Sequence, residues 1–233
     1  MSSHSLAFVA GATGYTGRSV VMALRDAHVS TLAHVRPDSA SLGRWRQSFS
    51  ALGATVDTTP WDLAALTQTF ATRRPTVVFG LLGTTRHRGA ADGGTYESVD
   101  YGLTAMLLDA ALAAGIRPRF VYLSSLGVRD GGSPGSYLEV RWRFEQKLIA
   151  SGLPYVIARP SFITGPDREE SRPMERFGAR MGDGVLGLVG ALGGRSLQAR
   201  FASTTAEILG GALVRLALNP GGDAVVAEGA ALR

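Results

Sequence analysis

The sequence predicts a single α/β domain with a doubly wound parallel sheet and helices on both faces. Short apolar runs rich in β-branched residues alternate with longer segments of helical period, and the alternation continues without a linker along the 233 residues. A glycine-rich turn joins the first apolar run to the first helical segment. The length suffices for one sizeable core, so we expect residues 1–233 to form one domain.

Six strands are expected, at residues 6–10, 31–36, 54–57, 76–82, 119–125 and 154–159. Between the fourth and fifth, apolar residues at helical spacing from Val99 to Ala114 predict a helix that packs on the sheet and ends at Gly115. Near the end of the chain, Thr204 and Glu207 form a capping-box pattern that predicts a last helix, running to Asn219.

Composition excludes several classes of function. The net charge is +5, but the basic residues are scattered, so nucleic-acid binding is not expected. Cysteine is absent and the four histidines show no ligand spacing, so no metal site is expected. The longest uncharged apolar stretch, 184–194, falls short of the roughly 20 residues of a membrane span. The start lacks the basic region of a signal peptide, so we expect a mature, cytoplasmic protein.

The motif Gly11-x-x-Gly14-x-x-Gly17 directly follows the first strand and opens the first helix. In that context Gly11 allows the tight turn, Gly14 lets the backbone approach a pyrophosphate, and Gly17 lets helix and strand pack closely. The helix start offers unpaired N–H groups and a positive dipole end. We therefore expect a bound dinucleotide; the alternative is a turn that serves chain geometry alone.

The end of the second strand predicts which dinucleotide is bound. No acid stands there to accept from a ribose 2′-OH, and Arg36 can grip a 2′-phosphate, with Arg18 able to reinforce the contact. NADP(H) is therefore preferred, with NAD(H) possible. The alternative is that Arg36 is a solvated surface charge.

Tyr137 and Arg141 share one face of a predicted helix, and Ser125 closes the fifth strand. Because the carboxyl ends of parallel strands form the ligand crevice, Ser125 and this helix face are expected near the cofactor.

The chain resembles the short-chain dehydrogenase/reductase superfamily, in its extended and atypical branches, over nearly its whole length. The similarity is carried by GATGYTG (11–17), Asp62-Leu63, VDYGLTAMLLDAALAAG (99–115), FVYLSS (120–125), Tyr137-x-x-x-Arg141 and ARPSFITGP (158–166). LGTTR (82–86) and DREESRP (167–173) resemble the small atypical branch that includes the Tat-interacting oxidoreductase-like proteins.

The resemblance implies a Rossmann fold in which Tyr137 is the general acid/base and Ser125 hydrogen-bonds the substrate oxygen. The family has lysine where Arg141 stands; a permanent cation still favours tyrosinate, but arginine cannot relay a proton. Only Lys147 of the 24 basic residues is lysine, so neutral drift can explain the arginine. Asp100, where extended members usually have Asn, is a second departure, and it puts the water-mediated proton relay in doubt.

The resemblance also implies cofactor contacts from several loops. Asp62 is expected at the adenine amino group, and the backbone of Pro160 to Ile163 at the nicotinamide carboxamide. The full expected set is Gly11, Thr13, Gly14, Tyr15, Thr16, Gly17, Arg36, Asp62, Leu82, Gly83, Thr84, Pro160, Ser161, Phe162 and Ile163, with Thr85 beside Thr84. Structural alternatives are a helix cap for Asp62, a loop stiffener for Pro160, a turn serine for Ser125 and a buried ring for Tyr137. Glu139 and Glu145 are expected to be solvated helix charges.

Two functions of different class follow. One is an NADP(H)-dependent oxidoreductase acting on a carbonyl or alcohol, and the other is an NADP(H)-binding sensor or partner-binding protein with little catalysis. Nucleotide-sugar epimerase or dehydratase chemistry ranks last, because it usually needs a longer C-terminal domain. Residues 160–200 are expected to cap the substrate side, where the apolar part of 173–195 lines a pocket for a small-molecule substrate or a homodimer contact.

Overall fold

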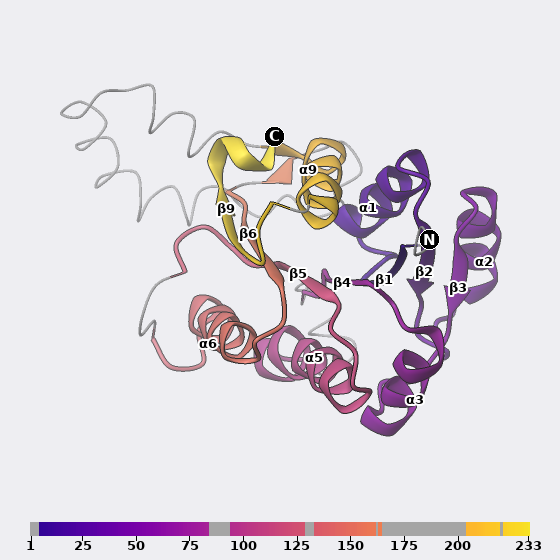
Figure 1. Ribbon diagram of the computed structural model, residues 1–233, viewed down its shortest axis with the longest axis horizontal. Coiled ribbons are helices and arrows are strands. Elements are labelled where there is room, and N and C mark those ends of the chain that lie inside the picture. Colours follow the sequence, from indigo (N-terminus) through magenta and orange to yellow (C-terminus); the bar gives the residue numbers. More distant parts are fainter. Residues whose placement is uncertain (1–4, 84–93, 129–132, 162, 165–203, 220) are drawn as a thin grey trace.

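The computed structural model describes residues 5–83, 94–128, 133–161, 163–164, 204–219 and 221–233. Seven strands within these residues form one sheet in the order β3-β2-β1-β4-β5-β6-β9, and every pairing is parallel (Figure 1). The strands are β1 (Leu6–Ala10), β2 (Ser30–His34), β3 (Thr55–Asp57), β4 (Val77–Gly80), β5 (Arg119–Leu123), β6 (Tyr155–Arg159) and β9 (Ala224–Glu228). The predicted doubly wound α/β fold is confirmed.

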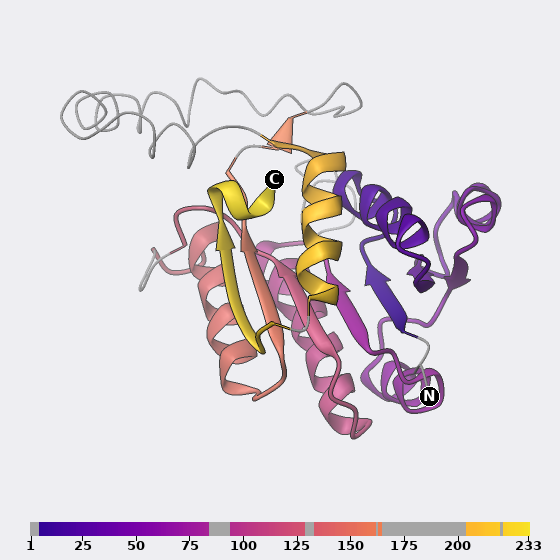
Figure 2. The ribbon, with the colours of Figure 1, turned by 45° about the horizontal axis from the view of Figure 1, so that its top comes forward.

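Helices cover both faces of this sheet, as Figures 1 and 2 show. One face carries α1 (Tyr15–Asp26), α2 (Leu42–Ala51) and α9 (Ala206–Leu218), and the other carries α3 (Leu63–Arg73), α5 (Thr104–Ala113) and α6 (Tyr137–Ala150). In β1, Ala7 and Val9 pack toward the first set, whereas Phe8 and Ala10 pack toward the second. Because both faces are covered, the strand is a continuous apolar run rather than an alternating one.

The sequence did not predict three strands. β9 follows the last helix and pairs with β6, which makes it an edge strand. β7 (Ile163–Thr164) and β8 (Thr204–Thr205) form a separate two-stranded parallel sheet. β7 and β8 have only two residues each, and β9 is an edge strand that is mostly exposed or half-buried although Ala224–Ala227 is apolar.

The helix predicted between the fourth and fifth strands is two helical segments. A π-helix, η1 (Tyr96–Leu103), runs directly into α5. The expected end is confirmed: Gly115 has φ +65°, and the amides of Gly115 and Ile116 donate to the carbonyls of Leu112 and Ala111. This arrangement is a Schellman motif, which explains why glycine stands there.

The last helix begins one residue later than predicted. Thr205, not Thr204, is its N-cap and accepts a hydrogen bond from the Ile208 amide at 3.3 Å. Thr204 instead pairs with Ile163 in the β7–β8 sheet, which gives its backbone a different partner. The helix then leads to β9 and a short 3₁₀-helix, η2 (Gly229–Leu232).

Helices α1 and α9 lie side by side in both views and approach closely at one glycine (Figures 1 and 2). A Cβ at Gly210 would lie 2.8 Å from the carbonyl carbon and the Cβ of Ser19. A Cβ at the next residue, Gly211, would have no atom within 4 Å among the described residues. Only the first of these adjacent glycines is therefore required by packing.

We predict opposite effects on stability for the two adjacent substitutions. Gly210→Ala forces α1 and α9 apart and should lower the free energy of unfolding by about 1–3 kcal/mol. Gly211→Ala removes helix-interior glycine without a clash and should raise it by about 0.5–1 kcal/mol. Urea unfolding of both variants measures the two effects, and equal shifts in the same direction would contradict the close approach.

Candidate functional site

The candidate site lies where the strand order reverses, between β1 and β4. From β1 the strand order proceeds through β2 and β3 toward one edge of the sheet, and from β4 it proceeds through β5 and β6 toward the other edge. In open parallel sheets the crevice outside the carboxyl ends at such a switch point is where ligands bind. The segments that leave these ends are the glycine loop after β1, residues Leu81–Gly83 after β4 and Ser124–Val128 after β5.

The glycine loop is too crowded on its inner side for any side chain. Gly11 has φ +83°, and a Cβ there would lie 2.7 Å from the Leu81 carbonyl oxygen. A Cβ at Gly17 would overlap the Gly11 carbonyl oxygen, and one at Gly14 would lie 3.2 Å from the same atom. These contacts bring the start of α1 against the ends of β1 and β4. The roles expected for Gly11 and Gly17 in the turn and the packing are thus visible in the geometry.

The outer side of the loop exposes backbone at the start of α1. Gly14 is the N-cap, is exposed and offers no side-chain cap, and the first turn of the helix contains no acidic residue. The helix therefore begins with N–H groups and a positive dipole end that no acidic side chain of its first turn neutralises. Thr13 and Tyr15 beside Gly14 are half-buried, whereas Thr16 is buried. This bare cradle has the form that a diphosphate requires.

The ends of β2 and β3 are joined by a buried histidine. His34 donates from Nε2 to the Thr59 carbonyl at 2.8 Å, and its ring packs edge-on against Trp61 at 4.7 Å. Burial lowers the pKa of His34, and this outweighs the opposing effects of the Thr59 carbonyl and Asp57. The imidazole is therefore a neutral structural group that fixes the loop carrying Trp61 and Asp62.

Asp62 has the structural role that the sequence left as an alternative. It is the N-cap of α3, and its Oδ1 accepts from the Ala65 amide at 2.9 Å. The side chain is exposed, so a contact with adenine stays a prediction. Arg36, two residues beyond β2, is 44% exposed and has Nε 3.8 Å from Oδ1 of Asp38. An acid therefore does stand near Arg36, two residues further along the chain.

Arg141 is buried, and its guanidinium is turned into the protein. Nη1 donates to the Leu123 carbonyl and to the Tyr122 hydroxyl, and Nη2 donates to the Leu82 carbonyl at 3.1 Å and to Oδ1 of Asp100 at 2.6 Å. Nε is buried and has no partner among the described residues. Burial lowers the pKa of Arg141, but Tyr122, Tyr137 and Asp100 outweigh that effect and raise it above the ordinary value. Arg141 therefore stays charged.

The pairing of Arg141 with Asp100 links the two departures from the family pattern. Asp100 is completely buried and Arg141 is 4% exposed, so neither charge is solvated and each compensates the other. Gly83 lies against them, because a Cβ there would be 3.2 Å from Nη2 of Arg141. Arg141 and Asp100, the two positions at which the chain differs from the expected family residues, thus form one ion pair.

Tyr137 is the first residue of α6 and lies beside this pair. Its ring centroid is 5.0 Å from the guanidinium carbon of Arg141 and 5.3 Å from the ring of Tyr96. Tyr137 is half-buried, and so is Ser125, whose hydroxyl makes a 3.4 Å contact with the Leu126 carbonyl. Burial raises the pKa of the neighbouring Tyr122, which therefore stays protonated and does not compete as a proton donor.

A second buried polar cluster, missed by the sequence analysis, lies one turn further along α6. Glu145 is fully buried, so the expectation that it is a solvated charge is wrong. It accepts from the Ser124 hydroxyl and from Arg159, which also reaches Glu228 of β9 at 3.2 Å. The signal was its spacing: Tyr137, Arg141 and Glu145 recur every four residues on one helix face. Glu139 is also not simply solvated, because it has Arg143 and the Gly135 amide as partners.

The remaining predicted residues divide between described and undescribed parts. The Pro160 carbonyl accepts from the Leu126 amide at 2.9 Å, which ties the loop after β6 to the loop after β5. Ser161 follows it, and Ile163 lies in β7. Thr84, Thr85, Phe162 and most of the expected cap at 160–200 lie outside the described residues.

The sequence of residues 11–184 matches a family model described as NAD(P)H-binding. A mitochondrial protein of Aspergillus terreus, fmp52-1, is 32% identical over 174 residues, which cover 71% of this chain and 69% of that protein. TIC 62, a chloroplastic protein of Pisum sativum, is 36% identical over 75 residues, which cover 29% of this chain and 14% of TIC 62. A solved structure from Bacillus halodurans, described as an NAD-dependent epimerase or dehydratase, aligns with a TM-score of 0.67 at 18% identity and covers 95% of this chain and 92% of its own.

These comparisons confirm the expected resemblance to NAD(P)H-binding proteins and the expected fold. They correct the expected location: the relatives are named as mitochondrial or chloroplastic proteins, so the cytoplasmic assignment is wrong. The composition of the first residues was insufficient to assign a compartment. Among the helices in the described ranges, none has the length and apolar character needed to cross a membrane.

We predict strong coupling between the two buried charges at the site. Asp100→Asn and Arg141→Met should each lower the free energy of unfolding by about 3–5 kcal/mol, because each leaves one buried charge uncompensated. The double variant should lose less than the sum of the singles, as measured by urea unfolding. Asp26→Asn, which breaks an exposed pair with Arg25, is the control and should change stability by less than about 1 kcal/mol. Additive losses at 100 and 141 would refute the coupling.

Proposed function

Because the chain belongs to the NAD(P)H-binding family, we propose that it is an NADP(H)-dependent oxidoreductase in which Tyr137 is the general acid/base. The observation that supports this role is the position of the Tyr137 ring, 5.0 Å from the permanent cation of Arg141 at the site end of α6. The guanidinium that contacts this ring also bonds to the carbonyls of Leu82 and Leu123, so Tyr137 lies beside the segments that leave β4 and β5. Ser125 at the end of β5 is the partner proposed to hydrogen-bond the substrate oxygen.

The described residues fit a nicotinamide dinucleotide. The cradle of Gly11, Gly14 and Gly17, where a Cβ would collide with backbone at two of the three positions, accepts a diphosphate against the start of α1. When bound, the reduced nicotinamide would supply a hydride to the carbonyl carbon of the substrate.

The chain's own residues would supply the one proton that must accompany the hydride. Tyr137 donates its hydroxyl proton to the carbonyl oxygen as that oxygen gains negative charge, and in the reverse direction tyrosinate removes the proton from the alcohol. The tyrosinate left after reduction is stabilised by Arg141, which stays protonated throughout. Tyrosinate must then regain its proton from solvent, because arginine does not supply one.

One observation favours a second function, that of a cofactor-binding sensor or partner protein with little catalysis. Asp100 neutralises Arg141 at 2.6 Å, and four of the guanidinium N–H groups bond to the protein interior. The charge available to Tyr137 is therefore smaller than that of an unpaired lysine. NADPH binding without its consumption across a panel of aldehydes, ketones and quinones would decide for this function.

Preference for NADP(H) over NAD(H) is part of the proposal and rests on Arg36. Its guanidinium lies just beyond the end of β2, where the 2′-phosphate of NADP(H) is held in this fold. Asp38 nearby can orient this guanidinium, since its carboxylate is 3.8 Å from Nε.

We predict that Tyr137→Phe lowers turnover of a carbonyl substrate by about 10²-fold to 10⁴-fold, because the general acid is lost. The dissociation constant for NADPH, measured by calorimetry, should not change. Tyr155→Phe is the matched control, since Tyr155 begins β6 at the opposite end of the strand from the site. Turnover by the Tyr137 variant at the parent rate would disprove the assigned role.

A further prediction concerns the cofactor preference. Arg36→Asp should weaken NADPH binding and strengthen NADH binding, moving the ratio of the two affinities by at least about 10-fold, because a charge-assisted contact becomes a repulsion. Arg25→Asp on the exposed part of α1 serves as the charge-matched control. An unchanged ratio in titrations with both cofactors would show that Arg36 does not read the 2′-phosphate.

A further inference from the structure

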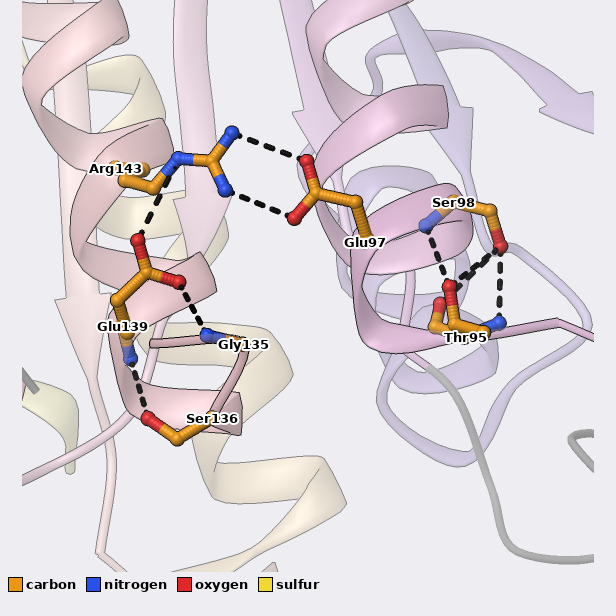
Figure 3. A network of polar contacts seen from close by, with 7 residues as sticks. All are labelled: Thr95, Glu97, Ser98, Gly135, Ser136, Glu139 and Arg143. Carbon is orange, nitrogen blue, oxygen red and sulfur yellow. Dashed lines mark hydrogen bonds and ion pairs between the residues drawn. The ribbon is translucent and has the colours of Figure 1, made fainter. Parts of the chain in front are cut away.

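Two helices, α6 and η1, begin side by side, and each has its own cap (Figure 3). Ser136 caps α6 by accepting from the Glu139 amide at 3.2 Å. Thr95 and Ser98 cap η1 reciprocally, with hydrogen bonds of 3.0 and 2.9 Å. The first residue after each cap is a tyrosine, Tyr137 in α6 and Tyr96 in η1.

Two arginines of α6 connect it to η1: the buried Arg141 bonds to Asp100, and the more exposed Arg143 bonds to Glu97. Arg143 donates from Nη1 and Nη2 to the two carboxylate oxygens of Glu97, at 2.8 and 3.0 Å, and its Nε lies 3.6 Å from Oε1 of Glu139 (Figure 3). The other oxygen of Glu139 accepts from the Gly135 amide at 3.3 Å, which fixes the residue before the α6 cap. The Arg143 guanidinium also lies 4.5 Å from the ring of Tyr101 in η1. We call Glu97, Arg143 and Glu139 the clamp.

The clamp spans the same two helices as the tyrosine pair. Tyr96 and Tyr137 meet edge to face at 62°. Glu97, which follows Tyr96 in η1, joins the same two helices through two parallel hydrogen bonds from Arg143 of α6. Bidentate pairing of this kind fixes direction as well as distance. These hydrogen bonds add an exposed link between α6 and η1 to the buried Arg141–Asp100 pair, near the helix starts that carry Tyr137 and Tyr96.

We propose that the clamp of Glu97, Arg143 and Glu139 is a positioning device that holds Tyr137 against Tyr96 in the orientation for proton transfer. Its catalytic consequence rests on the proposed function, but the positioning itself does not. The side chains of Arg143 and Glu97 are 38% and 54% exposed, so salt screens the clamp, whereas the buried Arg141–Asp100 pair is largely protected. The position of Tyr137 is consequently sensitive to ionic strength.

The test measures the chemical reactivity of the tyrosines, which requires neither cofactor nor substrate. Nitration by tetranitromethane, followed at each tyrosine by peptide mass spectrometry, compares the full chain with Arg143→Leu, Arg143→Lys and Glu97→Gln. Lys147→Ala is the matched control, because Lys147 on the same helix forms a similarly exposed pair with Asp109 of α5 at 2.9 Å.

Breaking the clamp should raise the nitration rate at Tyr96 and Tyr137 by about 2- to 5-fold, as expected for loss of an exposed ionic network. Arg143→Lys should restore part of the protection, because lysine keeps the charge but not the two-pronged geometry. In 1 M NaCl the parent should approach the rates of Arg143→Leu, while that variant should change little. Lys147→Ala should react like the parent.

Unchanged rates at both tyrosines in Arg143→Leu, or an equal rise in Lys147→Ala, would overturn the proposal. If the protein turns over a substrate, Arg143→Leu should lower kcat by the same factor without changing KM or NADPH affinity. If Tyr137→Phe keeps full activity while nitration still follows the clamp, the proposed function fails and the positioning stands. The two proposals are thereby separable.

Discussion

One buried guanidinium holds the site end of this sheet together. Arg141 projects from α6 and bonds to a carbonyl beyond β4, a carbonyl of β5, the hydroxyl of Tyr122 and the carboxylate of Asp100 in η1. A charge at that depth is tolerated only because Asp100 compensates it and the carbonyls satisfy its N–H groups. A Cβ at Gly83 would crowd Nη2 of Arg141, and burial keeps Tyr122 protonated although Arg141 acts to lower the pKa of that phenol.

The central fold could be predicted because its signals are local. The buried strands are continuous apolar runs, and the glycine loop has steric needs that only glycine meets, as Gly11 and Gly17 show. The tyrosine and arginine of α6 were found from their spacing of four residues and are indeed neighbours at the site. What could not be predicted depends on pairing over long distances. The partner of Asp100 is 41 residues away along the chain. The burial of Glu145, in α6, depends on its ion pair with Arg159 of β6.

The replacement of the family's lysine has a different meaning once its partner is known. Lysine and arginine are both cations, but the guanidinium of Arg141 has more N–H groups to satisfy, and with Asp100 it forms a paired, hydrogen-bonded unit. Such a unit fixes geometry well but offers less unbalanced charge to Tyr137. The choice between an oxidoreductase and a cofactor-binding sensor therefore depends on how strongly Arg141, when paired with Asp100, still interacts with the Tyr137 side chain.

The pairing of β6 with β9 also has a consequence for how the molecule is made. Arg159 bridges to Glu228, 69 residues later, and the whole of β6 awaits this distant segment for its second neighbour. On a translating ribosome the open rim of β6, with unsatisfied amides and carbonyls, would persist until the final strand emerges. The edge of β6 is therefore covered late, by a pairing between residues far apart in the sequence. Until then the nascent chain must avoid aggregation in another way.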